Sequence, residues 1–195
     1  MVVNGRNRRI MSPVNFAIKP SDVSLKGETW KFQPASVLYS DSLIVVNNVE
    51  IKNKRQSFLA NGTLSKQTPD SLGIKLNNFD IGFVDLFLEK PFKLHGYFSG
   101  RANFSLNKNT NKMFAEIRGD SVSVYGAPVG DMLLLGKWSE PKKRYNLLLH
   151  TYLDGTSKLA ADGYYKPDSS YVDIRSTLND LSLTYFEPFL SSVAT

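Results

Sequence analysis

Residues 97–106 read Tyr-Phe-Ser-Gly-Arg-Ala-Asn-Phe-Ser-Leu, and their alternation decides the fold class. Tyr97 and polar residues occupy the odd positions, whereas the even positions are apolar or glycine: Phe98, Gly100, Ala102, Phe104 and Leu106. Because successive side chains of a strand point to opposite faces, this alternation predicts a β-strand that is apolar on one face. Turn-forming residues follow at 107–111, and the next predicted strand continues the apolar face with Met113, Ala115 and Ile117.

The same period of two continues on both sides of this hairpin. Downstream, the alternating apolar positions include Leu147, Leu149, Val172, Ile174 and Leu178. Upstream, strands are predicted at about 14–19, 22–26, 28–33, 35–39, 42–52, 56–66 and 71–79. The phase slips around Gly119 and Asp120, which predicts a β-bulge or a corner. We therefore expect an all-β fold: an elongated, curled, antiparallel and repetitive sheet, gutter-like, with an apolar inner face. About 14 strands at a spacing of ~4.8 Å would span ~65 Å.

Two apolar segments break the alternation and predict short helical plugs at 81–88 and 184–190. Their apolar residues are Phe83, Phe87, Leu88, Phe186, Phe189 and Leu190. Residues 76–88 align without a gap on residues 178–190, and each copy follows a glycine-led strand and a Pro-Asp-Ser turn. This internal repeat predicts one elongated β domain over 14–195, with two units at about 14–90 and 91–195. Residues 1–13 are expected to be a flexible tail.

Composition excludes several classes of protein. The chain has 195 residues, 42% of them hydrophobic, and a formal net charge of +6. It contains no cysteine and two histidines, which excludes disulfides, thiolate metal sites and multi-histidine metal sites. The sequence contains no apolar run of about 18 residues or more, so it predicts no membrane-spanning helix. The first residues lack the apolar stretch of a secretory signal, so we expect either a cytoplasmic protein or, in preference, an internal piece of a longer chain.

The sequence offers few candidates for catalysis. Asp80, Asp85, Glu89 and His95 lie close together around the first plug, but turns and strand ends collect such residues without catalysis. The spacings of a nucleophile elbow, a phosphate-binding loop, a dinucleotide fold and a zinc-binding helix are all missing. We therefore predict no catalytic residues, no metal, no cofactor and no enzymatic activity. Basic and aromatic residues around 101–108 point to opposite faces, which argues against a nucleic-acid partner.

Several short motifs, taken in order over roughly residues 14–190, resemble the TamB/AsmA-like family, in particular the long TamB-type translocation and assembly proteins of Bacteroidetes. The motifs are WKF at 30–32, LIVVNNVEI at 43–51, ANG at 60–62, LGIKLNNF at 72–79, GYFSGRA at 96–102, PVGDM at 128–132 with Trp138, and the apolar ending at 181–190. The resemblance implies a periplasmic segment of an envelope protein, anchored in the inner membrane by a helix outside this sequence. It also implies phospholipid transfer between the inner and outer membranes, and support of outer-membrane protein assembly. The implied partners are phospholipid acyl chains, neighbouring segments of the same long chain and, through regions outside this sequence, an outer-membrane barrel.

The apolar positions themselves favour a lined surface. We hypothesise that acyl chains slide along a groove wall formed by Phe98, Ala102, Phe104, Leu106, Met113, Ala115, Ile117, Leu147, Leu149, Val172, Ile174 and Leu178. The alternative is that the same side chains fill a dry core. A closed β-sandwich adhesin or carbohydrate-binding module would instead expose aromatic residues on one outer face, with Trp30, Tyr125, Trp138, Tyr152 and Tyr164 as candidates. A glycan-active enzyme would need two carboxylates about 5–10 Å apart, and the sequence pairs none.

Overall fold

The computed structural model describes residues 13–25, 27–83, 93–105 and 113–179. This part of the chain is almost entirely β-structure, which confirms the expected fold class. Its strands are β1 (Val14–Ile18), β2 (Ser21–Leu25), β3 (Glu28–Phe32), β4 (Ala35–Tyr39), β5 (Leu43–Lys52), β6 (Ser57–Ser65), β7 (Leu72–Asp80), β8 (Leu94–Phe104), β9 (Phe114–Val124), β10 (Ala127–Ser139), β11 (Arg144–Leu153), β12 (Thr156–Lys166) and β13 (Tyr171–Leu178). A 3-10 turn, η2 (Pro167–Ser169), joins the last two strands.

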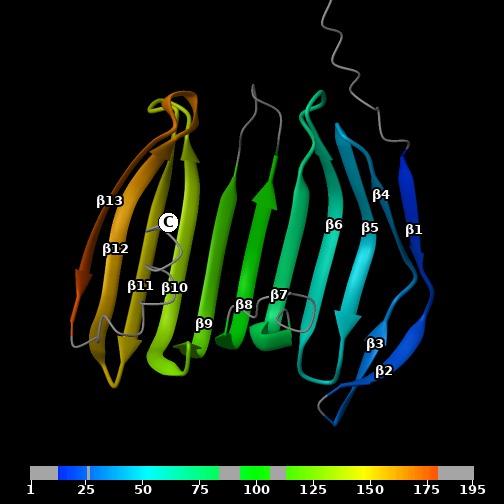
Figure 1. The fold of residues 1–195 in the computed structure, drawn as a ribbon, viewed down its shortest axis with the longest axis horizontal. Coiled ribbons are helices and arrows are strands. Elements are labelled where there is room, and N and C mark those ends of the chain that lie inside the picture. Colours follow the sequence, from blue (N-terminus) through cyan, green and yellow to red (C-terminus); the bar gives the residue numbers. More distant parts are fainter. Residues whose placement is uncertain (1–12, 26, 84–92, 106–112, 180–195) are drawn as a thin grey trace, which may run out of the picture.

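All strands belong to one open antiparallel sheet that does not close into a barrel (Figure 1). Eleven strands lie side by side in the order β1-β4-β5-β6-β7-β8-β9-β10-β11-β12-β13, and the β2–β3 hairpin joins β5 through two residue pairs of β3. Ten steps of ~4.8 Å give a row ~48 Å wide. The expected width of ~65 Å assumed about 14 strands in one row, whereas the described part of the chain has 13 strands, and two of these, β2 and β3, add no width to the row. The single open sheet also differs from the closed sandwich of the alternative reading.

The strand register carries the apolar positions of neighbouring strands onto one face. Ala102 of β8 pairs with Ile74 of β7 on one side and with Ala115 of β9 on the other. Directly opposed residues of antiparallel strands point to the same face. The residues between them form the other face, where Arg101 pairs with Glu116. The alternation within each strand therefore adds up, across the sheet, to one apolar face and one face that carries the charged residues, which we call the polar face although the pairs Leu38–Val45 and Leu135–Leu148 also lie there.

Three bulges correct the phase of this alternation. Asn48, Asn78 and Ser121 have positive φ values of 54°, 46° and 52°, and the strand register shifts beside each of them. The bulge expected near Gly119 is thus confirmed, two residues further along at Ser121. An inserted residue returns the following side chains to their original face, and Val122 is accordingly buried.

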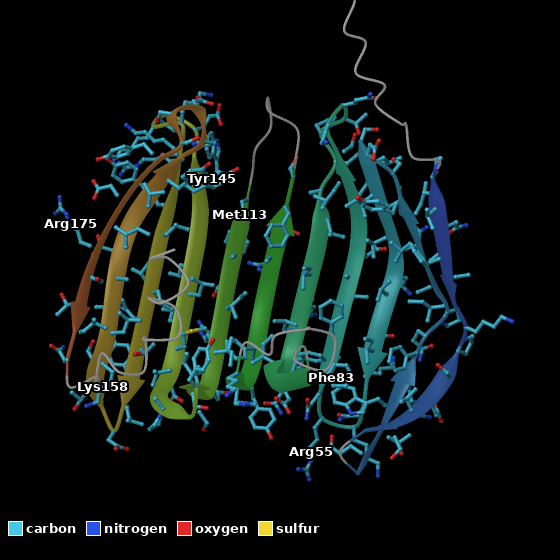
Figure 2. All side chains as sticks on the ribbon, in the orientation of Figure 1. Arg55, Phe83, Met113, Tyr145, Lys158 and Arg175 are labelled. Atoms are coloured by element: carbon cyan, nitrogen blue, oxygen red, sulfur yellow. The ribbon has the colours of Figure 1, made fainter. Side chains whose placement is uncertain are left out.

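Two buried clusters hold one end of the sheet together. In the first, the ring centroid of Trp30 lies 5.0 Å from that of Phe83 and 5.8 Å from that of Phe79. The second consists of Phe98, Val122 and Val129. Figure 2 shows Phe83 at the end of the strands where the β2–β3 hairpin attaches, whereas Tyr145 lies at the opposite end. The core is therefore concentrated at one end of the strands.

The two hairpins that the sequence alignment relates can be compared through their strand pairing. In the β6–β7 hairpin the pairs are Phe58–Leu76, Ala60–Ile74 and Gly62–Leu72. In the β12–β13 hairpin the pairs at the aligned positions are Leu159–Leu178, Ala161–Ser176 and Gly163–Ile174. The two hairpins therefore share one register, although their turns differ in length by one residue.

Candidate functional site

The candidate site is the apolar surface that the register creates, which we call the apolar face. Its aliphatic and aromatic members include Val14, Phe16 and Ile18 on β1, Val37 and Tyr39 on β4, Ile44, Val46, Val49 and Ile51 on β5, Phe58, Ala60 and Leu64 on β6, Leu72, Ile74, Leu76 and Phe79 on β7, Phe98, Ala102 and Phe104 on β8, Ala115 and Ile117 on β9, Met132, Leu134 and Trp138 on β10, Tyr145, Leu147 and Leu149 on β11, Leu159, Ala161 and Tyr165 on β12, and Val172, Ile174 and Leu178 on β13. From β4 to β13 no charged residue occupies a paired position of this face in the described part of the chain.

The groove-wall residues predicted from the sequence share this face but differ in exposure. Phe98 and Ala102 are each 4% exposed and so belong to the packed part of the face. On β13, Val172, Ile174 and Leu178 are 55%, 53% and 40% exposed. The remaining described members are half-buried: Phe104, Met113, Ala115, Ile117, Leu147 and Leu149. Leu106 lies outside the described residues. The accessible apolar surface is therefore larger toward the β13 edge than over β8.

The plug prediction can be compared with the structure at one residue. Residues 81–83 form a 3-10 turn, and Phe83 is buried against Trp30 and Phe79. This side chain therefore belongs to the core of the described structure. The other predicted plug residues lie outside the described residues: Phe87, Leu88, Phe186, Phe189 and Leu190.

The apolar face extends further than the predicted set of lining residues. Phe16 of β1 is 57% exposed, and Val14 and Tyr39 beside it are also exposed. In β10, Met132 and Leu134 continue the face between β9 and β11. The alternation of residues 14–18, Val-Asn-Phe-Ala-Ile, carries the same signal as the central strands. This alternation would have been sufficient to include β1 in the predicted groove wall.

A row of aromatic side chains crosses the apolar face at the end opposite the core clusters. The ring centroid of Tyr145 lies 4.7 Å from that of Trp138 and 6.4 Å from that of Tyr165, which it stacks against. Burial raises the pKa of Tyr145 above its usual value, and the neighbouring Tyr165 phenol adds to the rise. The phenol therefore stays neutral well above neutral pH, as suits a side chain on an apolar surface.

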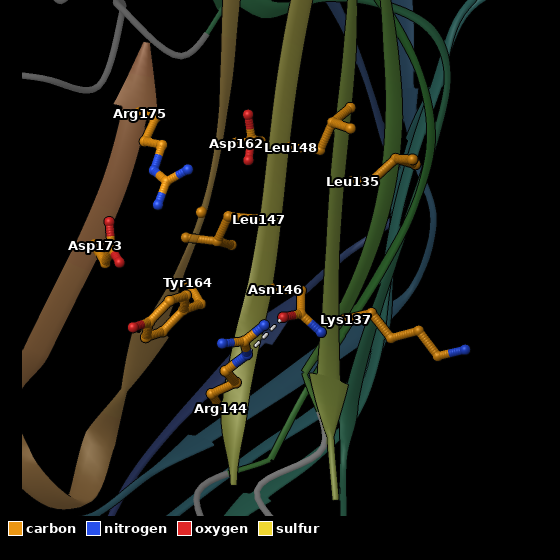
Figure 3. A pocket seen from close by; sticks show the side chains of 11 residues that line it. Leu135, Lys137, Arg144, Asn146, Leu147, Leu148, Asp162, Tyr164, Asp173 and Arg175 are labelled. Atoms are coloured by element: carbon orange, nitrogen blue, oxygen red, sulfur yellow. Dashed lines mark hydrogen bonds between the residues drawn. The ribbon is translucent and has the colours of Figure 1, made fainter. Parts of the chain in front are cut away.

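The polar face carries a depression of about 480 Å³ over β10 to β13 (Figure 3). The Arg144 guanidinium carbon lies 4.0 Å from the centroid of the Tyr164 ring, and Arg144 Nε donates a 2.9 Å hydrogen bond to Asn146 Oδ1. Partial desolvation raises the pKa of Tyr164, and a hydrogen bond with Asp173 adds to the rise. Arg175 supplies a further charge at the same depression. Its lining combines these polar and charged side chains with Leu135 and Leu148.

The aromatic residues proposed for a carbohydrate-binding surface do not share one outer face. Trp30 is buried in the core, and Trp138 lies on the apolar face. Tyr152 and Tyr164 both lie on the polar face but are far apart along the strands. Tyr164 of β12 pairs with Asn146, which precedes Tyr152 by six residues on β11. Tyr125 lies in the β9–β10 turn. The described structure therefore offers no common aromatic platform of these five residues.

The candidate acid–base residues are only partly described. Asp80 Oδ1 accepts a hydrogen bond from the Gly82 amide at 2.9 Å. A Cβ atom on Gly82 would lie 2.8 Å from His95 Nδ1 and 3.1 Å from Asp80 Oδ1, so both side chains flank this glycine. Asp85 and Glu89 lie outside the described residues. Within residues 13–25, 27–83, 93–105 and 113–179, no group of three or more histidine, aspartate or glutamate side chains is placed to hold a metal ion.

Comparisons with protein-family models, curated proteins and solved structures find no match to this chain. A separate search of the described residues for a helix long and apolar enough to cross a membrane finds none. The apolar face and the resemblance of the sequence motifs therefore bear most directly on function.

Proposed function

We propose that this chain is a periplasmic segment of a TamB/AsmA-like envelope protein, and that its apolar face holds phospholipid acyl chains during transfer between the inner and outer membranes. One observation carries the proposal: the register gathers most of the apolar side chains of the row on one face of an open sheet, and that face is still exposed at β1 and β13. Soluble proteins rarely leave a large contiguous apolar surface exposed unless it contacts a partner, a ligand or a membrane. The same protein would support outer-membrane protein assembly through regions outside this sequence, and we propose no catalytic role.

The size of the hydrophobic effect fits a surface along which a lipid moves. Complete burial of a ~16-carbon chain gains on the order of 10 kcal/mol, at ~0.8 kcal/mol per methylene. A chain lying on an open face is covered on one side only, so it gains roughly half of this. A gain of ~5–6 kcal/mol, before the entropic cost of association, corresponds to weak and reversible binding. The apolar face would therefore keep an acyl chain out of water without trapping it.

The proposal predicts that acyl binding depends on one face of β13. Replacing Val172 and Ile174 together by aspartate puts two charges on the exposed part of the apolar face. We expect the affinity for a fluorescent long-chain fatty acid to fall about tenfold or more, because contact area is lost and a charge must be desolvated. The matched control replaces Tyr171 and Thr177 by aspartate, on the polar face of the same strand. Fluorescence titration measures both affinities, with thermal unfolding as the test of folding.

Equal losses in the two double variants, or no binding by the unaltered chain, would exclude an acyl-binding role for the apolar face. Native mass spectrometry of the purified chain provides a second readout. We expect co-purified phospholipid on the unaltered chain and on the polar-face control, and its loss from the apolar-face variant.

A further inference from the structure

The repeat places β13 in the position that β7 occupies in the first unit. Strand β7 is paired on both edges, with β6 on one side and β8 on the other. Strand β13 is paired with β12, in the register that β7 shares with β6. In the described part of the chain no strand pairs with the second edge of β13. That edge is therefore the counterpart of the edge of β7 that β8 covers.

Backbone hydrogen bonds show which groups face this edge. The Asn179 amide donates to the Lys158 carbonyl at 2.9 Å, so the backbone of Asn179 points toward β12. In an antiparallel strand the amide and carbonyl of one residue point to the same side, and those of the next residue point to the other side. Ile174 and Ser176 precede Asn179 by five and three residues, both odd numbers, and the β12–β13 register has no shift between them. Their amides and carbonyls therefore point away from β12.

The first unit shows the same geometry with its partner in place. The Thr63 amide donates to the Ser71 carbonyl at 3.1 Å, so Ser71 faces β6. Leu72 and Ile74, which align with Ile174 and Ser176, pair with Phe104 and Ala102 of β8. At aligned positions of the two units, the strand edge thus offers donors and acceptors at the same spacing.

The edge of β13 lacks the features that usually protect an edge strand. Its eight residues include no proline, and its pairing with β12 has no bulge. Its charged residues, Asp173 and Arg175, lie on the polar face, and no charge interrupts Val172, Ile174 and Leu178 on the apolar face. Natural edge strands are commonly blocked by inward charges, prolines or bulges because bare edges pair with other chains.

We propose that the second edge of β13, which no strand of the described residues pairs with, is a strand-acceptor site that binds an antiparallel segment with the residue pattern of β8. Such a segment carries small or apolar side chains at alternate positions, opposite Ile174, Ser176 and Leu178, and polar side chains between them. Bound in this register, it would extend both the apolar face and the polar face by one strand. Main-chain hydrogen bonds would supply affinity, and the alternating side chains would supply specificity.

The test uses a synthetic peptide that copies residues 94–104 and the full chain. Because the chain contains no cysteine, Ser176→Cys creates a single thiol. The β7–β8 register places the Ala102 position of the peptide opposite residue 176. We expect a peptide carrying Ala102→Cys to form a disulfide with the Ser176→Cys chain at least about tenfold faster than one carrying Asn103→Cys, whose side chain points to the other face. Equal rates would overturn the proposed register.

A second measurement isolates the main-chain contribution. Ser176→Pro removes an amide that faces the second edge of β13 and leaves the bonds to β12 in place, whereas Ser176→Ala keeps the amide. We expect the affinity for the labelled peptide, measured by fluorescence anisotropy, to fall about threefold to tenfold in Ser176→Pro and to change little in Ser176→Ala. Similar affinities in the two variants, or no peptide binding by the unaltered chain, would overturn the proposal. Disulfide-linked dimers of Ser176→Cys without peptide would identify a second copy as the occupant and would contradict the proposed strand pattern.

Discussion

Leu147 on β11 is flanked by a glycine on each side, Gly136 of β10 and Gly163 of β12. The two glycines have different surroundings. A Cβ atom on Gly163 would lie 2.1 Å from the Asp173 carbonyl oxygen and 2.7 Å from Ile174 Cα. A Cβ atom on Gly136 would meet nothing closer than 3.6 Å. Only Gly163 is therefore required by the packing of the backbone.

This difference predicts opposite responses to the same substitution. We expect Gly163→Ala to lower the free energy of unfolding by about 2–3 kcal/mol, because the strands must move apart to admit the methyl group. Gly136→Ala is expected to be neutral or to stabilise by up to ~1 kcal/mol, through the restricted unfolded chain. Urea unfolding of the two variants measures both changes. A loss of similar size in both variants would contradict the role assigned to Gly163.

Ser121 adopts a left-handed backbone conformation at its bulge, with φ of 52°. This conformation is costly for residues other than glycine and less so for asparagine. Its amide donates to Asp131 Oδ1 at 3.2 Å, a bond that does not use the serine side chain. We therefore expect Ser121→Gly to stabilise the chain by about 0.5–1 kcal/mol. Ser123→Gly, in regular strand two residues away, should destabilise by about the same amount. Thermal unfolding would contradict this account if the two changes had the same sign.

At the scale of a strand, the aromatic row of Trp138, Tyr145 and Tyr165 on the apolar face makes the stability of the fold depend on the protonation of the Tyr145 phenol. Because burial raises the pKa of Tyr145, the folded chain holds this proton more tightly than the unfolded chain does. The resulting stabilisation is complete below about pH 10, the pKa of an unperturbed tyrosine, and is lost as pH rises through the folded pKa. Tyr145→Phe should therefore reduce the fall in stability above pH 10.

The same tyrosine reports on coverage of the apolar face. An acyl chain lying over Tyr145 would remove more water from the phenol, so we expect its pKa to rise further when a non-ionic lipid-like detergent is added. The ultraviolet difference titration between the unaltered chain and Tyr145→Phe isolates this group. Tyr164 on the polar face, isolated in the same way with Tyr164→Phe, should not shift. A shift at Tyr164 as large as that at Tyr145 would indicate unspecific detergent binding.

Strand periodicity was the feature that sequence alone predicted best. The upstream strands begin and end within one residue of the expected ranges, because apolar residues recur at every second position along each strand. The branch at the β2–β3 hairpin was not predicted. Strand β3 contacts β5 through Lys31 and Phe32 alone, and short strands separated by short turns look alike in sequence whether they extend a row or leave it. The bulges at Asn48 and Asn78, unlike the one at Ser121, were not predicted, because no glycine stands beside either asparagine.

For the candidate site, sequence predicted which face a residue occupies but not its exposure. Phe98 and Ile174 both follow the alternation, yet Phe98 is buried by Val122 and Val129 whereas Ile174 lies on the edge strand and is exposed. Exposure depends on contacts between residues far apart in the chain and on the position of a strand in the row. The clustering of the core at one end of the strands has the same origin.

At the scale of the whole molecule, the thirteen strands of the described residues form one sheet whose two faces differ in chemistry. A closed sandwich would bury its apolar faces between two sheets, but the described strands form a single layer. Hydrophobic stabilisation therefore remains available to whatever covers the apolar face. The proposed lipid role assigns acyl chains to that surface, and the proposed strand acceptor lengthens the sheet that carries it.

The most direct test of the lipid role compares neighbouring residues that point to opposite faces. A photo-crosslinking amino acid is placed at Leu149 or Ile174 on the apolar face, and at His150 or Arg175 on the polar face of the same strands. After illumination in cells that make the full protein, mass spectrometry measures covalently bound phospholipid. We predict lipid adducts at Leu149 and Ile174 and none above background at His150 and Arg175. Absence of lipid at the apolar positions, or equal capture on both faces, would contradict the account.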